Sequence, residues 1–224
     1  MNTYLDGEGG VFMEKSYTKI YTTGATVPLK IRPGHFATNH AHINYYIDVT
    51  TLKARTKEAE EVAQALVGMY LYDTVIDTIV CMEGTEVIGA FLAEELAKGG
   101  FLSTNAHKSI YVISPEFNNN SQIIFRDNLI PMIRDKHVMI LMASVTTGRT
   151  LNKAVESIQY YGGILQGASA IFSAMDSLDG VPIKSVFGKK DLPDYTYSDY
   201  RDCPLCKAGK KIDALVNTLS LIHI

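Results

Sequence analysis

The stretch KHVMILMASVTTGRTLNKAVESIQYYGG, residues 136–163, decides the fold class. Its apolar run Val138–Met142 is short enough to form one buried strand. The next apolar residues recur every three or four positions, so they share one face of a helix: Leu151, Ala154, Val155, Ile158 and Tyr161. Gly162 and Gly163 are expected to end that helix.

The loop between strand and helix has the composition of an anion site. Residues 144–150, SVTTGRT, bring hydroxyl groups, one glycine and one arginine to the start of a helix. Free backbone N–H groups point outward there and the helix dipole is positive, so the expected guest is a phosphate. The same residues also fit an ordinary strand-to-helix turn with hydroxyl caps, and the spacing does not choose between the two. The loop is neither a Walker loop nor a dinucleotide fingerprint.

Periodic helices alternate with short β-rich runs through the rest of the chain, which favours an α/β fold with a mostly parallel sheet. The pattern predicts helices over residues 56–72, 87–96, 128–134 and 212–219, with an arm or edge element near Tyr17. Strands are predicted over residues 75–81, 109–113, 122–125, 168–174 and 183–187.

A second loop, Met82-Glu83-Gly84-Thr85, follows another predicted strand. Ligands of open α/β sheets bind at the carboxyl ends of the strands, so this loop is a candidate second ligand site. Gly84 and Thr85 suit an anion through their backbone. Glu83 could hold a water molecule bound to Mg²⁺. Alternatively, its negative charge could simply stabilise the N-terminus of the next helix.

Cations and histidines crowd residues 24–48, among them Lys30, Arg32 and His35. They could form a hood that offers positive charge to an acidic base or a pyrophosphate. His40-x-His42 could contribute to a metal site, because alternate residues of a strand share a face. We favour a solvated loop and edge strand over the metal, since the sequence shows no third ligand.

Cys203 and Cys206 form a Cys-x-x-Cys near the C-terminus. The pair is half of a zinc site, which histidines or a second subunit could complete. It could also be a redox pair or a plain turn around Pro204, although no thioredoxin-like context surrounds it.

Composition narrows the class of protein. The 224 residues carry 21 basic and 24 acidic side chains, a net charge of −3, which argues against a nucleic-acid partner. No apolar run approaches the length of a membrane span, so we expect no membrane partner. Three cysteines do not make a disulfide framework, and we expect a cytoplasmic protein.

The loop Thr146-Thr147-Gly148-x-Thr150 resembles the phosphoribosyl-pyrophosphate (PRPP) motif of the type I phosphoribosyltransferases. Residues 42–48, HINYYID, preceded by Leu29-Lys30, resemble the N-terminal region of the orotate enzymes, and the likeness runs roughly from Thr23 onward. The family implies a five-stranded, mostly parallel sheet flanked by helices. It divides the chain into an N-terminal arm and hood (1–48), an α/β core (49–190) and a tail (191–224).

The resemblance also implies an activity, which is transfer of phosphoribose from PRPP with Mg²⁺ to a pyrimidine base, orotate, with release of pyrophosphate. Thr146, Thr147, Gly148, Arg149 and Thr150 would hold the 5′-phosphate. Ser144 would touch the ribose, and Glu83, Gly84 and Thr85 the pyrophosphate. Lys30 or Arg32 would reach the base or pyrophosphate, with Lys30 and Ser144 as catalytic candidates. The family further implies a homodimer and a nucleobase or nucleoside monophosphate as ligand.

Three segments depart from the family pattern. Ala143-Ser144 stands where two acidic residues normally precede the loop, and the strand at residues 171–174 lacks an acidic–basic pair. The predicted mobile loop, residues 114–122, carries no lysine or arginine, although His107, Lys108 and Arg126 flank it and could substitute or be surface charges. Two alternatives therefore stand beside the enzyme: a PRPP- or nucleotide-binding regulator, and an interaction protein assembled through its Cys-x-x-Cys tail.

Overall fold

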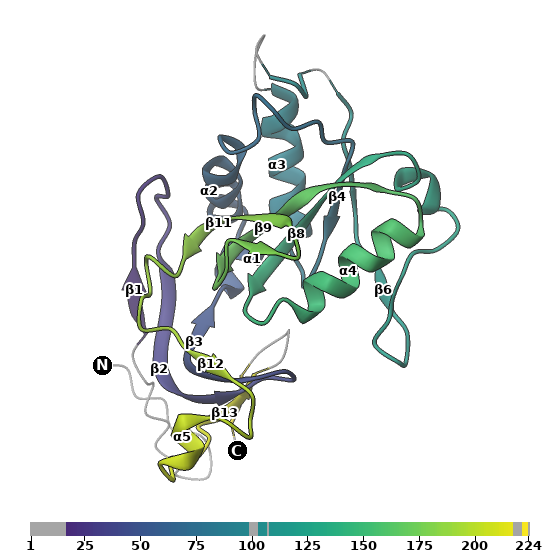
Figure 1. Cartoon of the computed structure of the whole chain (residues 1–224). Helices are drawn as coiled ribbons and strands as arrows, with labels where there is room; N and C mark the ends of the chain where they lie inside the picture. Colours follow the sequence, from purple (N-terminus) through teal and green to yellow (C-terminus); the bar gives the residue numbers. More distant parts are fainter. Residues whose placement is uncertain (1–16, 99–102, 107, 217–220, 224) are drawn as a thin grey trace, which may run out of the picture.

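The computed structural model describes residues 17–98, 103–106, 108–216 and 221–223. Two large sheets, one small hairpin and a set of short helices make up this part of the chain (Figure 1). The strands are β1 (Thr18–Ile20), β2 (Leu29–Ala37), β3 (His42–Asp48), β4 (Thr78–Cys81), β5 (Tyr111–Ile113), β6 (Glu116–Phe117), β7 (Ile123–Ile124), β8 (His137–Val145), β9 (Ile164–Ser173), β10 (Ser177–Leu178), β11 (Val181–Gly188), β12 (Tyr197–Ser198), β13 (Ala214–Val216) and β14 (Leu221–His223). The helices are α1 (Thr50–Ala54), α2 (Thr56–Val67), α3 (Glu86–Lys98), the 3₁₀ turn Ile130–Met132, α4 (Arg149–Tyr160) and α5 (Pro204–Lys207).

The main sheet has the strand order β10-β11-β9-β8-β4-β5. Neighbouring strands from β11 to β5 run parallel, and only the two-residue β10 pairs antiparallel with β11. The predicted α/β fold with a mostly parallel sheet is therefore confirmed. The described residues contain the five expected parallel strands plus one short antiparallel strand.

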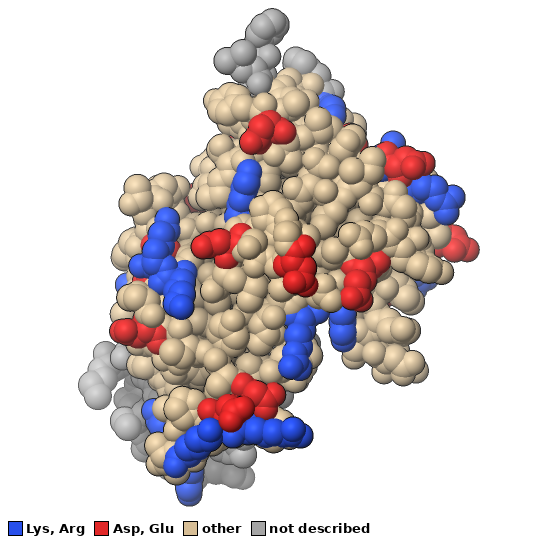
Figure 2. Space-filling view, viewed as in Figure 1, with Lys and Arg blue, Asp and Glu red and all other residues tan. Residues whose placement is uncertain are grey.

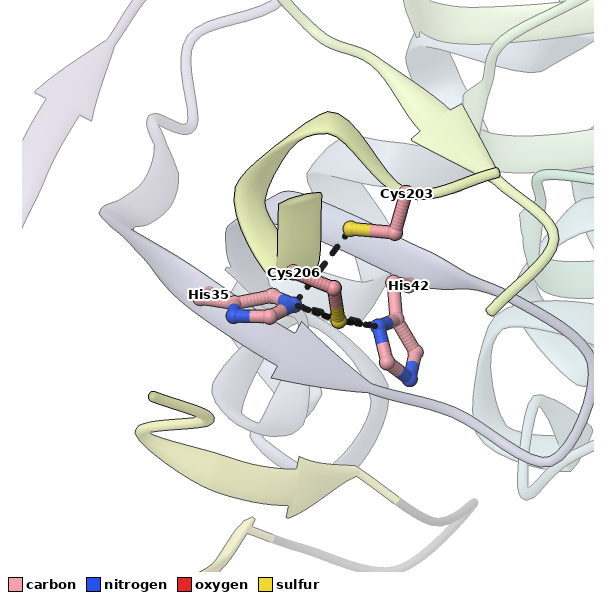
Figure 3. Close-up of side chains that lie close together, drawn as sticks. All are labelled: His35, His42, Cys203 and Cys206. Atoms are coloured by element: carbon pink, nitrogen blue, oxygen red, sulfur yellow. Dashed lines mark hydrogen bonds between the residues drawn. The ribbon is translucent and has the colours of Figure 1, made fainter. Parts of the chain in front are cut away.

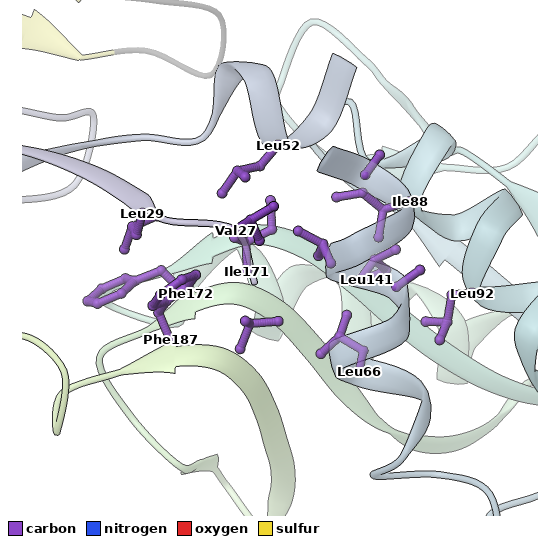
Figure 4. Close-up of a cluster of buried hydrophobic side chains, with 14 of the residues drawn as sticks. Val27, Leu29, Leu52, Leu66, Ile88, Leu92, Leu141, Ile171, Phe172 and Phe187 are labelled. Atoms are coloured by element: carbon purple, nitrogen blue, oxygen red, sulfur yellow. The ribbon is translucent and has the colours of Figure 1, made fainter. Parts of the chain in front are cut away.

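Helices cover both faces of this sheet, and the sequence of β8 reflects that. Met139 and Leu141 pack with α2 and α3, whereas Val138, Ile140 and Met142 point to the opposite face and pack with α4. Successive side chains of a strand alternate between faces, so two buried faces require a continuous apolar run. Figure 4 shows Leu141 on the first face with Leu66, Ile88 and Leu92 around it.

The second sheet forms the hood and draws strands from both ends of the chain. Its order is β12-β3-β2-β13-β14, with β1 pairing on β2 as the predicted edge element. Ala214 of β13 lies beside Phe36 of β2 in parallel register. The predicted terminal helix over residues 212–219 is therefore wrong where the structure describes it. The apolar run 214–216 pairs with a free edge of β2, and this non-local pairing overrides helix propensity.

Two other helix predictions change in extent. The helix expected over residues 56–72 ends at Val67, and the buried Tyr70 follows in a turn with its hydroxyl group 2.5 Å from Ser169 Oγ. The helix expected over residues 128–134 is a single 3₁₀ turn. The glycines expected to end α3, residues 99–100, lie outside the described residues.

None of the described helices combines the length and the apolar character that crossing a membrane would require. Acidic and basic side chains are interspersed on the face of the molecule that Figure 2 shows, without one dominant patch of a single sign.

Candidate functional site

A cavity of about 200 Å³ lies between the carboxyl ends of the main-sheet strands and the hood. Residues 142–151 line one side of it, and Thr38, Asn39 and His40 of the hood hairpin line the other. Lys53 of α1 and Glu83, which follows β4, complete the charged part of the lining. The cavity thus brings together the hood and both loops that the sequence singled out.

The loop from β8 to α4 presents an open helix start to this cavity. Gly148 is the N-cap of α4 with φ of 74°, and no side chain among the described residues caps the helix. The first intrahelical bond runs from the Asn152 N–H to the Gly148 carbonyl oxygen, at 2.8 Å. The earlier N–H groups of α4 therefore remain available to an anion. All five predicted phosphate-binding residues, 146–150, line the cavity.

Tyr195 orients the first threonine of this loop. Its hydroxyl oxygen lies 3.0 Å from Thr146 Oγ1, and its ring packs edge-on against Phe172. Burial raises the pKa of Tyr195 to about 12, so this phenol stays neutral at physiological pH. Sequence reasoning missed Tyr195, because it lies 49 positions from its partner, in a tail without a local motif.

A carboxylate lies beside the backbone of Ala143-Ser144, just before the loop of residues 146–150. The Ser144 N–H donates to Glu83 Oε2 at 3.4 Å, and Lys53 Nζ donates to the Glu83 carbonyl oxygen at 2.6 Å. Burial raises the pKa of the Glu83 carboxyl group, although the N–H groups of Ser144 and Ala143 and the charge of Lys53 oppose this. Glu83 is the one acidic side chain among the described residues that line the cavity.

His40 approaches the same loop from the hood. Burial, together with the charges of Arg149 and Lys153, holds the pKa of His40 below its usual value. His40 is therefore neutral at physiological pH and can donate or accept a hydrogen bond. The sequence offered His40 as a metal ligand beside His42, but the fold turns His40 toward the cavity.

Solved structures share this fold at low sequence identity. A phosphoribosyltransferase from Corynebacterium diphtheriae has a TM-score of 0.52 and 14% identity, over 73% of this chain and 90% of that one. UMP synthase from Leishmania donovani has a TM-score of 0.52 and 18% identity, over 73% of this chain and 34% of that one. Orotate phosphoribosyltransferase from Mycobacterium tuberculosis H37Rv, with Fe(III) dicitrate, has a TM-score of 0.50 and 15% identity, over 73% and 92%.

The protein has the type I phosphoribosyltransferase fold. A scan of protein-family models and a search of curated proteins find no match. The family resemblance read from the Thr-Thr-Gly loop is thus confirmed at the level of the fold. The helix start at Gly148 and the hood over the cavity are parts of that fold in this chain.

In this phosphoribosyltransferase fold, most of the second predicted loop lies outside the cavity lining. Gly84 and Thr85 are not among the residues that line the cavity. The buried Thr85 hydroxyl group donates to the carbonyl oxygens of Met82 and Leu141, at 2.9 and 3.0 Å, so it links β4 to β8. Only Glu83 of this loop projects into the cavity.

Lys30 and Arg32, predicted to reach the base or pyrophosphate, also lie outside the cavity lining. Lys30 lines a separate surface depression, and its Nζ donates to Thr51 Oγ1 at 3.4 Å. Arg32 is 6% exposed and lies over the Phe36 ring, and its Nε and Nη2 find no hydrogen-bond partner among the described residues. Their substrate roles stay predictions.

The basic residues beside the predicted mobile loop are engaged with acidic partners. This loop is the β6–β7 hairpin, and Arg126 pairs with Glu116 at its base. Lys108 lies 3.5 Å from Asp77. His107 lies outside the described residues. Lys153 of α4 reaches the tip of the hairpin, where its Nζ donates to the Ser121 carbonyl oxygen at 3.3 Å.

A cluster of four possible metal ligands lies in the hood, away from the cavity lining. It joins the predicted Cys203 and Cys206 with His35 and His42. The sequence showed no third ligand for His42, because the other three come from a different strand and from the tail.

Proposed function

We propose that this cavity binds PRPP and that the protein transfers phosphoribose to a nucleobase, with release of pyrophosphate. One observation carries the proposal: the α4 helix start at Gly148 faces a cavity, which is lined by Arg149 and by three threonines, Thr146, Thr147 and Thr150. Helix N-termini bind phosphate through free N–H groups and a favourable dipole. The orotate enzyme and UMP synthase with similar folds make orotate the first base to test.

The lining suggests how such a ligand would lie. Residues 146–150 would hold the 5′-phosphate, with Thr146 oriented by Tyr195. Ser144 and Glu83 would face the ribose hydroxyl groups. Lys53 and His40 would meet the pyrophosphate or the base from the hood side. Gly84 and Thr85 offer only backbone groups to the pyrophosphate, and Lys30 and Arg32 would need to move to reach the ligand.

Reaction at the anomeric carbon develops positive charge, which a nearby carboxylate favours electrostatically. Family members supply this charge from two acidic residues, but this chain has Ala143-Ser144 there. The Glu83 carboxylate, bonded to the Ser144 N–H, offers negative charge at the same place. We therefore assign Glu83 the part that the acidic pair plays elsewhere.

The same carboxylate fits the metal that the family uses. Mg²⁺ in phosphoryl-ligand sites is held by one or two carboxylates together with substrate phosphates and water. Glu83 provides one carboxylate at the cavity wall. When bound, Mg²⁺ neutralises charge that develops on the departing pyrophosphate.

A second candidate is a regulator that binds PRPP or a nucleotide without turnover. Two observations favour it. The Ala143 side chain cannot accept a hydrogen bond from a ribose hydroxyl group, and residues 114–122 contain no lysine or arginine for a departing pyrophosphate. The phosphate loop would persist in such a protein because binding still requires it.

Calorimetry followed by an activity assay separates these functions. We would titrate the protein with ribose 5-phosphate, PRPP and pyrophosphate in the presence of Mg²⁺, then measure pyrophosphate release from PRPP with orotate and a panel of other bases. Turnover with any base supports the enzyme and identifies its substrate. PRPP binding without release across the panel supports the regulator. Failure of every phosphate ester to bind overturns both.

A further inference from the structure

Four metal-ligand side chains converge in the hood, although they come from three separate segments. His35 belongs to β2, His42 begins β3, and Cys203 and Cys206 flank the start of α5. Figure 3 shows the two imidazole rings and two sulfur atoms pointing toward one common centre. Their ligand atoms all lie within 4.8 Å of one another.

Four of the six distances between the ligand atoms are close to those around one tetrahedral zinc ion. Zn–S and Zn–N bonds of about 2.3 and 2.05 Å imply S···N separations of about 3.5 Å and an N···N separation of about 3.3 Å. His35 Nε2 lies 3.5 Å from Cys203 Sγ and 3.6 Å from Cys206 Sγ. Cys206 Sγ lies 3.3 Å from His42 Nδ1, which lies 3.1 Å from His35 Nε2.

Hydrogen bonds alone do not account for this packing. His35 Nδ1 lies 2.9 Å from the Lys210 carbonyl oxygen, which can only accept, so Nδ1 carries a proton and Nε2 is the ring nitrogen left for a metal. His35 Nε2 then has a single lone pair, yet three polar atoms crowd around it in a side chain that is 0% exposed. A bound cation satisfies that lone pair and both sulfur atoms at once. The Lys210 contact also fixes the ring as outer-shell partners of metal sites do.

We propose that His35, His42, Cys203 and Cys206 bind one structural zinc ion that fastens the C-terminal tail to the hood. Two thiolates and two imidazoles in tetrahedral array are a zinc donor set. Four protein ligands leave no open position for substrate, so the site is structural and not catalytic.

The neighbouring contacts indicate what this ion holds in place. Beyond the cysteines, the Asp213 N–H donates to the His35 carbonyl oxygen at 2.7 Å, and the His35 N–H donates to Asp213 Oδ2 at 2.8 Å. From there β13 continues along β2. On the other side, His35 and His42 bracket the hairpin whose tip, residues 38–40, lines the cavity. The ion thus sits between the tail and a hairpin that covers the phosphate loop.

This placement gives the zinc ion an indirect effect on ligand affinity, a step that rests on the proposed function. Thr38 Oγ1 closes the hairpin tip by accepting from the N–H groups of His40 and Ala41, at 3.2 and 2.9 Å. The tip is therefore a hydrogen-bonded unit that joins the zinc ligands through the ends of β2 and β3. Removing the metal would let the unit move away from the cavity, weakening phosphate-ester binding although no zinc ligand touches the ester.

Metal content tests the site without reference to activity. Protein expressed with added zinc and dialysed without chelator should hold about one zinc ion per chain, because four ligands complete one tetrahedral ion. Cys203→Ser and Cys206→Ser should each weaken zinc binding more than about 100-fold, since losing outer-shell partners alone costs about 10–100-fold. Cys206→His should retain the metal. Cys81→Ser and His40→Ala change residues outside the cluster and should hold as much zinc as the wild type.

Cobalt substitution and thermal unfolding of the wild type test the site without depending on variants that could fold poorly. Co²⁺ added to metal-stripped wild type should give a tetrahedral spectrum with thiolate charge-transfer bands, and returned zinc should restore its melting temperature. Wild-type protein that takes up neither metal, or that holds a Cys203–Cys206 disulfide in place of zinc, overturns the proposal. Zinc binding with no affinity for any phosphate ester contradicts the proposed function and leaves the zinc site standing. Equal PRPP affinity with and without zinc refutes the effect on the hairpin.

Discussion

Replacing Gly148 with alanine should damage phosphate binding more than it damages the fold. Gly148 has φ of 74°, a left-handed conformation that costs an L-residue about 1–2 kcal/mol. A Cβ atom there would also lie 2.9 Å from Leu178 Cδ2, the end of a flexible side chain that can turn aside. We therefore expect Gly148→Ala to lower the free energy of unfolding by about 1–2 kcal/mol, mostly through the backbone.

The loss of ligand affinity should be larger than this strain suggests. To relieve the strain, the cap must rotate toward negative φ, which turns the first N–H groups of α4 away from the cavity. A hydrogen bond to a charged group contributes about 1.5–3 kcal/mol. Losing one such bond should weaken binding of ribose 5-phosphate by about 10- to 100-fold, since every 1.4 kcal/mol is tenfold.

Gly24 provides a matched control. It also has a left-handed backbone, with φ of 90°, a Cβ there would meet nothing within 4 Å, and it does not line the cavity. Gly24→Ala should therefore lose similar stability in urea titration but keep its calorimetric affinity. Gly148→Ala combined with Leu178→Ala removes the steric contact and should not restore binding. Unchanged affinity in a folded Gly148→Ala protein would refute the assignment of this helix start as the phosphate site.

Three further predictions address the cavity and the core. Thr147→Glu places a carboxylate beside the bound phosphate and should reduce calorimetric affinity more than tenfold by like-charge repulsion, and wild-type affinity for a nucleoside monophosphate would contradict this. Because the raised pKa of Glu83 penalises its ionised form in the folded state, wild-type stability should fall relative to Glu83→Gln as pH rises through that pKa and converge at low pH. Parallel urea-unfolding profiles across pH would oppose that reasoning. Leu141→Ala should lower the free energy of unfolding by about 2–5 kcal/mol, because Leu141 is fully buried in the core. A loss under about 1 kcal/mol would show that the core closes over the space left by the missing side chain.

The part of the molecule that sequence predicted best is the unit from β8 to α4. Its information is local: a strand buried on both faces, a glycine where the chain needs a left-handed cap, and a helix with one apolar stripe. Of the five apolar residues predicted to share one face, Leu151, Ala154, Val155 and Ile158 are buried, whereas Tyr161 is half-buried just past the end of α4. Local patterns therefore sufficed for the fold class and for singling out the loop of residues 146–150, which lines the cavity, whereas its binding of phosphate stays a prediction.

The hood could not be predicted in the same way because its contacts are non-local. His35 meets Cys203 across 168 positions, and His42 meets Cys206 across 164. A pair such as His40-x-His42 looks like one site in sequence, yet the turn between β2 and β3 sends the two rings to different places. The strand β13 illustrates the same limit, since three apolar residues become β only because β2 offers them an edge.

The backbone at Glu83 gives a separate reason to treat its side chain as functional. Glu83 has φ of 58° and Gly84 follows with φ of 80°, so two successive residues are left-handed. A glycine at position 83 would avoid the cost of about 1–2 kcal/mol that a side chain carries there. Strain of this kind persists where the surrounding structure uses the strained residue. What position 83 gains is a carboxylate against the Ser144 N–H, next to a loop that has no acidic residue of its own. An enzyme needs that charge at the reaction centre, whereas a protein that only binds phosphate would be better served without it.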